Sequence, residues 1–153
     1  MMDDLIQDAV RRMDKSVETT QHEFNSIRGS GTLIVQPFDP SSLKSIEKAI
    51  MESDLGLTPS NDGKLIRLPI PQLTEERRKD LVKVVRQRAE DGRVAVRNVR
   101  RDVMKHLEEL VRNGDVGDDD ERRAEERVQK LTDDHVHKID ELLKRKETEI
   151  LEV

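Results

Sequence analysis

The stretch that decides the fold runs from Thr74 to Asn113 and reads TEERRKDLVKVVRQRAEDGRVAVRNVRRDVMKHLEELVRN. It contains no proline, and Gly92 is its only glycine. Mostly small apolar residues recur in it at alternating steps of three and four: Val82, Val85, Ala89, Gly92, Val96, Val99, Val103, His106 and Leu110. This heptad seam predicts one helix of roughly 60 Å, capped by Thr74. Because small seam residues let helices approach closely, we expect it at the centre of a bundle.

Two further amphipathic segments flank this helix. The upstream segment runs from about Asp3 to Ile27, and its apolar stripe consists of Val10, Met13, Val17, Thr20, Phe24 and Ile27. The downstream segment follows a break at 113–120, and its stripe consists of Ala124, Val128, Leu131, His135, Ile139, Leu142 and Ile150. The short connection predicts that the last helix returns antiparallel to the central one. The fold class expected is mainly α, a long antiparallel three-helix bundle with a small α/β insert.

The insert occupies residues 29–73. Thr32 to Val35 is rich in β-branched residues and predicts a short buried strand. Asp39 and Pro40 form a helix start, with Asp39 as the N-cap, and the helix should extend to about Ser53. Residues 59–63 are turn material, and residues 65–68 predict a second strand, whose end is bracketed by Pro69 and Pro71.

Domain boundaries follow from these elements. We expect a bundle domain at 1–28 and 74–153 and an insert domain at 29–73, which leaves and re-enters at one end of the bundle. The hinge between them is assigned to Arg28, Gly29, Ser30, Gly31 and Pro71. The chain's two phenylalanines, Phe24 and Phe38, are both expected to be buried.

Composition narrows the class of protein. Charged residues make up 40% of the chain and hydrophobic residues 33%, which suits long helices that bury one stripe each. Disorder competes with this interpretation, but the regular helical period argues against it. Without cysteine there are no disulfides or thiolate chemistry, and no apolar run is long enough to span a membrane. We therefore expect an intracellular, soluble monomer that needs no cofactor.

Catalytic and metal-binding patterns are weak in this sequence. His135 and His137 differ by two positions, so on a helix they face different ways and suit a metal poorly. Gly29-Ser30-Gly31 has no lysine behind it, as a phosphate-binding loop would require. The acidic residues 118–120 lack the spacing of a calcium loop and suit a helix start instead. An enzyme is therefore not expected.

Arginine is the informative residue type. On heptad geometry Arg86, Arg93 and Arg100 share one line of the central helix, and Arg97 lies about 50° away. Such a row repels itself unless anions meet it, and phosphate backbone is the natural partner for guanidinium groups. In the alternative interpretation, glutamates of the last helix such as Glu121, Glu125 and Glu126 neutralise the row. The residues alone favour neither. The chain has no Trp or Tyr, so RNA recognition would be of backbone and shape.

Several ordered motifs in this chain match a known family. They include Ser53-Asp54-Leu55-Gly56-Leu57-Thr58-Pro59, the run from Leu73 to Leu81, and Val94-Ala95-Val96-Arg97-Asn98-Val99-Arg100-Arg101-Asp102. Asp14-Lys15, Asn25-Ser26-Ile27-Arg28 and Leu131-Thr132-Asp133 match as well. Across nearly its whole length the chain resembles the ribosome recycling factors.

The resemblance implies a three-helix bundle joined by a hinge to a β/α/β domain. It also implies binding between ribosomal subunits after termination, with the bundle against large-subunit ribosomal RNA and elongation factor G with GTP driving separation. Arg97 and Arg100 match the family's RNA contacts, with Arg78 next. The full candidate set is Arg97, Arg100, Arg78, Arg93, Arg86, Arg101 and Arg28. The expected location is the bacterial cytoplasm or the plastid stroma.

One departure from the family pattern stands at residues 29–31. In the family, the Ser-Ile-Arg of the first helix continues into Thr-Gly-Arg and then into strands bearing Tyr-Tyr-Gly-Thr-Pro. Here Arg28 meets Gly29-Ser30-Gly31, and the pattern resumes at Thr32. About half of the second domain is therefore expected to be missing, whether through an engineered linker or a natural junction. The competing function is a non-catalytic helical bundle that holds a protein partner.

Overall fold

The computed structural model describes residues 2–27, 31–71 and 73–152. The chain forms two compact units, which we call the bundle unit (residues 1–27 and 79–152) and the insert unit (residues 28–78). The predicted fold class is confirmed: long helices are accompanied by a small antiparallel sheet. The predicted domain boundaries, at 28/29 and 73/74, stay a prediction.

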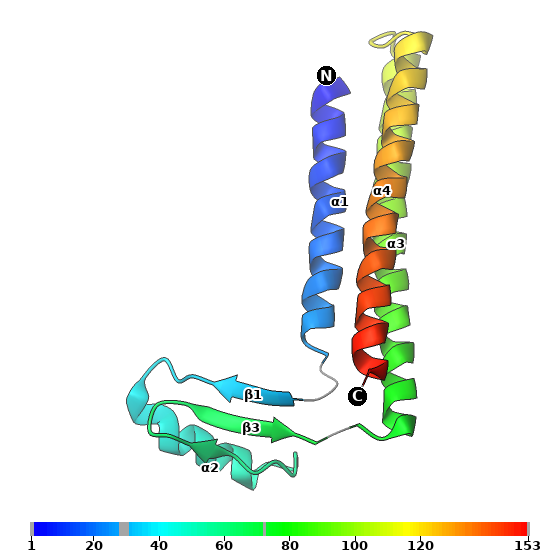
Figure 1. Ribbon diagram of the computed structural model, residues 1–153. Coiled ribbons are helices and arrows are strands. Elements are labelled where there is room, and N and C mark those ends of the chain that lie inside the picture. The colour runs from blue at the N-terminus through cyan, green and yellow to red at the C-terminus, as the bar shows by residue number, and fades with distance from the viewer. Residues whose placement is uncertain (1, 28–30, 72, 153) are drawn as a thin grey trace. The chain divides into compact units, whose positions relative to one another are not determined.

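Three long helices make the bundle: α1 (Met2–Asn25), α3 (Glu75–Arg112) and α4 (Asp118–Leu151) (Figure 1). The tight turn between α3 and α4 depends on Gly114, whose φ of 79° lies in the left-handed region that glycine tolerates best. Asp115 N–H donates to the Leu110 carbonyl and Gly114 N–H to the Val111 carbonyl, at 2.9 and 3.0 Å. These two bonds form a Schellman motif, which ends α3 and reverses the chain.

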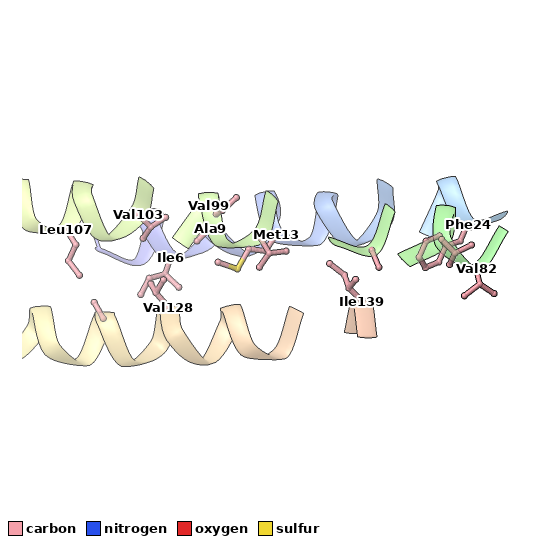
Figure 2. Packing of buried hydrophobic residues seen from close by; sticks show 14 of the residues in the cluster. Ile6, Ala9, Met13, Phe24, Val82, Val99, Val103, Leu107, Val128 and Ile139 are labelled. Carbon is pink, nitrogen blue, oxygen red and sulfur yellow. The ribbon is translucent and has the colours of Figure 1, made fainter. Parts of the chain in front are cut away.

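The bundle core is a continuous line of buried side chains along α3 (Figure 2). Its members on α3 are Val82, Val85, Ala89, Gly92, Val96, Val99, Val103 and Leu107. The predicted seam is correct up to Val103 and wrong beyond it, because Leu107 is buried while His106 is exposed and Leu110 is only half-buried. An α-helix has 3.6 residues per turn, so a strict heptad drifts around its surface over several turns.

The flanking helices show a similar shift of the stripe. On α1 the buried residues include Ile6 and Ala9, whereas the predicted Val10 and Val17 are half-buried. On α4 the buried set includes Thr132 and Lys146, whereas Leu131 and Leu142 are half-buried. Phe24 is buried as predicted.

At Gly92, side chains of α1 and α4 pack close to the backbone of α3. A Cβ atom placed there would lie 2.3 Å from Thr20 Oγ1 on α1 and 3.2 Å from Ile139 Cδ1 on α4. A glycine in a helix interior costs about 1 kcal/mol of helix stability relative to alanine. Close packing of all three helices offsets that cost here.

A polar pair also ties α1 to α4. The buried His135 ring has Nε2 2.6 Å from Asp14 Oδ1 and Nδ1 2.6 Å from the Leu131 carbonyl oxygen. Each ring nitrogen therefore lies within hydrogen-bond distance of an oxygen atom. His135, a member of the predicted stripe of α4, is buried.

The insert unit contains β1 (Gly31–Val35), a 3₁₀ turn η1 (Pro40–Ser42), α2 (Leu43–Glu52), β2 (Ser60–Asn61) and β3 (Ile66–Ile70). The strand order is β1-β3-β2, and both pairings are antiparallel. Leu43, Ile66 and Leu68 form its small core. Partly buried residues pack around them: Leu33, Val35, Ile46, Ile50 and Leu57.

Four predictions about the insert were wrong. Phe38 is fully exposed, and β1 buries only part of its surface, because one of its faces has no covering element among the described residues. β3 continues past the predicted end at Leu68 to Ile70, so Pro69 lies inside it. Residues 60–61 form the strand β2, which the turn-rich sequence around them concealed.

Two aspartates organise loops of the insert. The Asp39 carboxylate accepts from the backbone N–H and the hydroxyl of Ser41, and these bonds lower the pKa of Asp39. The Asp62 carboxylate accepts from the backbone N–H groups of Leu65 and Lys64, which lowers the pKa of Asp62. Both loops therefore depend on ionised carboxylates.

The insert unit is expected to lose stability in acid. A carboxylate whose pKa is lower in the folded state stabilises that state above its unfolded pKa, and the contribution disappears as pH falls through the folded value. Amide hydrogen exchange at 60–68 should therefore accelerate as pH drops below about 4, after correction for the intrinsic rate. Asp62→Asn should show faster exchange already at neutral pH and a smaller further change in acid. Equal acid sensitivity in Asp62→Asn and the unaltered chain would contradict this.

Candidate nucleic-acid interface

The structure places the predicted arginine line against α4. Arg86 Nε lies 2.7 Å from Glu147 Oε1, and Arg93 Nε lies 2.7 Å from Asp140 Oδ1. Only 18% of the Arg93 side chain is exposed. Its burial acts to lower the pKa of Arg93, but the hydrogen bonds that Arg93 donates to Asp140 and Glu90, together with their charges, outweigh this and raise it. These two guanidinium groups therefore hold α3 and α4 together.

The carboxylates that meet the line differ from those the sequence suggested. Glu121, Glu125 and Glu126 were named as neutralising groups, but the partners are Asp140 and Glu147. The reason is the antiparallel register, since the turn at 113–117 places the start of α4 beside the end of α3. Glu121 accordingly lies near Glu108. Burial and its acidic neighbours Glu125, Asp118 and Glu108 raise the pKa of Glu121.

Beyond Arg93 the charge balance changes. Arg97 Nη1 lies 3.6 Å from Glu90 Oε1, but the same carboxylate also serves Arg93 at 3.0 Å. One negative charge therefore faces two positive ones, and 45% of the Arg97 side chain is exposed. Such an exposed, shared ion pair contributes little stability. The Arg97 guanidinium is consequently available to an external anion.

Arg100 and Arg101 border a shallow groove of about 470 Å³ in the bundle unit. Its lining is Arg100, Arg101, Met104, Lys105, Glu108 and Gln129. Arg100 Nη1 donates to the neutral amide oxygen of Gln129 at 3.2 Å, so no carboxylate cancels its charge there. Within residues 73–152, Arg101 and Lys105 form no ion pair. Three cations against one carboxylate make this groove the strongest candidate anion site.

Lys105 is a functional candidate that sequence reasoning missed. It stands four positions after Arg101, a spacing that places two side chains on the same helical face. The signal in the sequence is this pair of basic residues at positions i and i+4.

The other predicted positions lie elsewhere. Arg78 is half-buried in the first turn of α3, and its Nε is buried with no hydrogen-bond partner in the part of the chain that the structure describes. Arg28, Gly29 and Ser30 fall outside the described residues, so the Arg28 site and most of the predicted hinge lie there too. Gly31 begins β1, with φ at 116°, and Pro71 follows β3.

Other classes of site are not evident in residues 2–27, 31–71 and 73–152. No cluster of three His, Cys, Asp or Glu side chains in these ranges could hold a metal ion. No helix in these ranges is both long and apolar enough to cross a membrane. The basic groove beside α3 is therefore the candidate functional site.

Comparison with known proteins agrees with the motifs. A family model described as "Ribosome recycling factor" matches residues 10–151. A ribosome-recycling factor of Rubrobacter xylanophilus is 47% identical over 180 aligned positions, which cover 97% of each chain. One from Alkaliphilus metalliredigens is 59% identical over 121 positions, which cover 79% of this chain and 65% of the relative.

Two solved structures have the same fold. One is a solution structure of the ribosome recycling factor, with a TM-score of 0.76 and 33% identity, and the match covers 99% of this chain and 98% of that one. The other belongs to models of the Thermus thermophilus ribosome recycling factor and the Escherichia coli elongation factor G bound to the E. coli post-termination complex. Its TM-score is 0.64 at 39% identity, with 99% of each chain covered. This chain, a long helical bundle with a small α/β insert, belongs to the ribosome recycling factor family.

Proposed function

We propose that this protein binds the post-termination ribosome by docking α3 of the bundle on large-subunit ribosomal RNA. The observation that carries the proposal is the basic groove, where Arg100, Arg101 and Lys105 face a single carboxylate, Glu108. Arg97 extends the same basic surface along α3. Ribosomal phosphates are the anions that suit it, since guanidinium groups offer forked donors and keep their charge.

The other candidate arginines take lesser roles in this proposal. Arg86 and Arg93 continue the line along α3, but their carboxylate partners make them mainly holders of the helix pair. Arg78, in the first turn of α3, would contact RNA beyond the groove, and Arg28 is kept as a proposed contact on the sequence match alone. The absence of Trp and Tyr leaves no large aromatic platform for bases, which suits contacts to phosphate and sugar.

Elongation factor G is the proposed partner for subunit separation. Support comes from the similar T. thermophilus factor, which was placed with elongation factor G on a post-termination complex. The work would come from the GTPase, and this protein would act as a wedge without bond chemistry of its own. The site of action would be the compartment that holds bacterial-type ribosomes, either the bacterial cytoplasm or the plastid stroma.

We further propose that the insert domain, residues 29–73, is a shortened form of the family's second domain. The alignment with the Rubrobacter relative extends over 180 positions, although this chain has 153 residues. Within residues 31–71, the buried hydrophobic side chains of the sheet and α2 are Leu43, Ile66 and Leu68. So small a core is marginal in stability. We therefore expect ribosome binding to be retained and recycling activity to be weakened or lost.

Two measurements test the proposed function. Co-sedimentation with bacterial ribosomes over a series of salt concentrations should show tight binding that weakens steeply with salt, because phosphate contacts release counterions. A subunit-splitting assay with elongation factor G and GTP should give less splitting than a full-length family member at equal ribosome occupancy. Binding that does not change with salt would refute the phosphate contacts, and full splitting would refute the loss of activity.

A further inference from the structure

Strand β1 has one edge without a partner strand. It pairs with β3 along Gly31–Val35, and the sheet order β1-β3-β2 leaves it at the margin. Among the described residues no other strand pairs with it. A bare strand edge presents backbone N–H and C=O groups that can bind another strand.

The alternation of hydrogen-bonded pairs in the β2–β3 hairpin shows which backbone groups of β1 point away from β3. Asp62 N–H donates to the Leu65 carbonyl at 3.2 Å, so residues 62 and 65 form a hydrogen-bonded pair. Because such pairs alternate along an antiparallel ladder, the main chain of Arg67 faces β2 at Ser60. The main chains of Ile66 and Leu68 then face β1.

Pro69 independently supports the same alternation of hydrogen-bonded pairs. It opposes Thr32 and has no N–H to donate, so this position suits a pair without hydrogen bonds between β1 and β3. On β1, therefore, Leu33 and Val35 bond to β3. The N–H and C=O groups of Thr32 and Ile34 point to the open edge.

The side chains on this edge are uncharged. No Asp, Glu, Lys or Arg occurs in residues 29–38, although such residues commonly protect strand edges. Leu33 and Val35 pack into the insert core, so Ile34 projects from the opposite face of the sheet, 53% exposed. Phe38, shortly after the strand, is fully exposed. This edge is open, apolar and free of charge repulsion.

We propose that the open edge of β1 binds the β1 edge of a second copy of this chain. In the antiparallel register centred on Leu33, Thr32 of each copy lies opposite Ile34 of the other. The outward groups of Thr32 and Ile34 then form four hydrogen bonds related by a two-fold axis. The two sheets become one sheet of six strands, and each exposed Ile34 gains a β-branched neighbour across the pair.

A second copy suits the edge better than a charged partner would. The segment is uncharged and matches itself in an antiparallel arrangement, and residues 29–73 contain five acidic and four basic side chains, so repulsion between insert units is small. Two short strands bury little area, which predicts a weak dimer that forms at high concentration. The sequence alone led us to expect a monomer.

Sedimentation velocity of the full chain from low micromolar to millimolar concentration tests the proposal. The unaltered chain should shift from monomer to dimer over this range. Ile34→Lys should remain monomeric, because it places like charges together at the edge without touching the insert core. Val84→Lys is the matched control, since Val84 is a similarly exposed apolar residue on α3, and it should dimerise like the unaltered chain.

A cysteine probe tests the register. The chain has no cysteine, so Leu33→Cys should give a disulfide-linked dimer on mild oxidation, because directly opposed strand residues lie within disulfide range. Val84→Cys should cross-link far less. A chain that stays monomeric at millimolar concentration overturns the proposal, and so does unchanged dimerisation of Ile34→Lys. Equal cross-linking of both cysteine variants overturns the register.

Discussion

Replacing Arg100 and Arg101 together by glutamine is expected to weaken ribosome binding about 100-fold at physiological salt. Each charged hydrogen bond to a phosphate contributes roughly 1.5 kcal/mol, which corresponds to about a factor of ten in the dissociation constant. The plot of log affinity against log salt should become shallower by about two, one for each arginine–phosphate pair that the substitutions remove. The bundle should remain folded, because neither side chain forms an ion pair within residues 73–152.

The control variant for this experiment is Lys144→Gln combined with Arg145→Gln. Both residues are exposed on α4 and form no ion pair in residues 73–152, and their replacement removes the same two positive charges. Its ribosome affinity should stay within about threefold of the unaltered chain, because long-range charge effects are screened beyond about 10 Å. Equal losses in the two variants would show that overall charge, and not the groove, governs binding.

Gly92→Val is expected to lower the free energy of unfolding of the bundle by roughly 3 kcal/mol. The new side chain would overlap Thr20 Oγ1 and crowd Ile139 Cδ1, so α1 and α4 would both have to move away from α3. A small gain in helix propensity over glycine cannot offset such overpacking. Chemical denaturation followed by circular dichroism measures the loss.

A double-mutant cycle identifies the cause of this loss. Gly92→Ala should destabilise the bundle through its clash with Thr20, and Thr20→Ala should partly restore stability by removing that oxygen. Gly117→Ala is the control, since a Cβ there meets nothing within 4 Å, and it should change stability by less than about 1 kcal/mol. Strictly additive effects of the Gly92 and Thr20 changes would count against a steric origin.

The bundle could be predicted from the sequence because its signal is periodic. Val82 to Val103 repeats with one spacing over several turns, and few structures other than a buried helix face satisfy that pattern. The error appeared at the far end, where Leu107 and not His106 is buried. The rotation of a heptad stripe around the helix accumulates over many turns, so a short stretch of sequence does not reveal it.

The insert was harder to predict because its elements are short and depend on partners distant in sequence. Phe38 was expected in a core, yet the described residues provide no surface that covers it. β2 has two residues, Ser60 and Asn61, whose strand character comes from pairing with β3 and not from their own propensity.

The candidate site was partly predictable. Arginine spacing on α3 predicted a basic face along this helix, and the structure places Arg100 and Arg101 beside a groove there. Arg93 pairs with the carboxylate of Asp140, whereas Arg100 bonds to an amide. This difference depends on the antiparallel register of α4. Turn geometry sets that register, and side chains 47 and 29 positions apart meet as a result.

The choice of an amide at position 129 has a mechanical consequence. Gln129 accepts from Arg100 and donates to Asp133 at 2.9 Å, so the guanidinium is aimed by a neutral clasp. A glutamate in its place would form a stronger, charged hydrogen bond with Arg100 and neutralise its positive charge. The amide orients the arginine, but its hydrogen bond is easily replaced by one to a stronger acceptor. The helix pair is therefore less rigid, and the cation is already oriented when an anion binds.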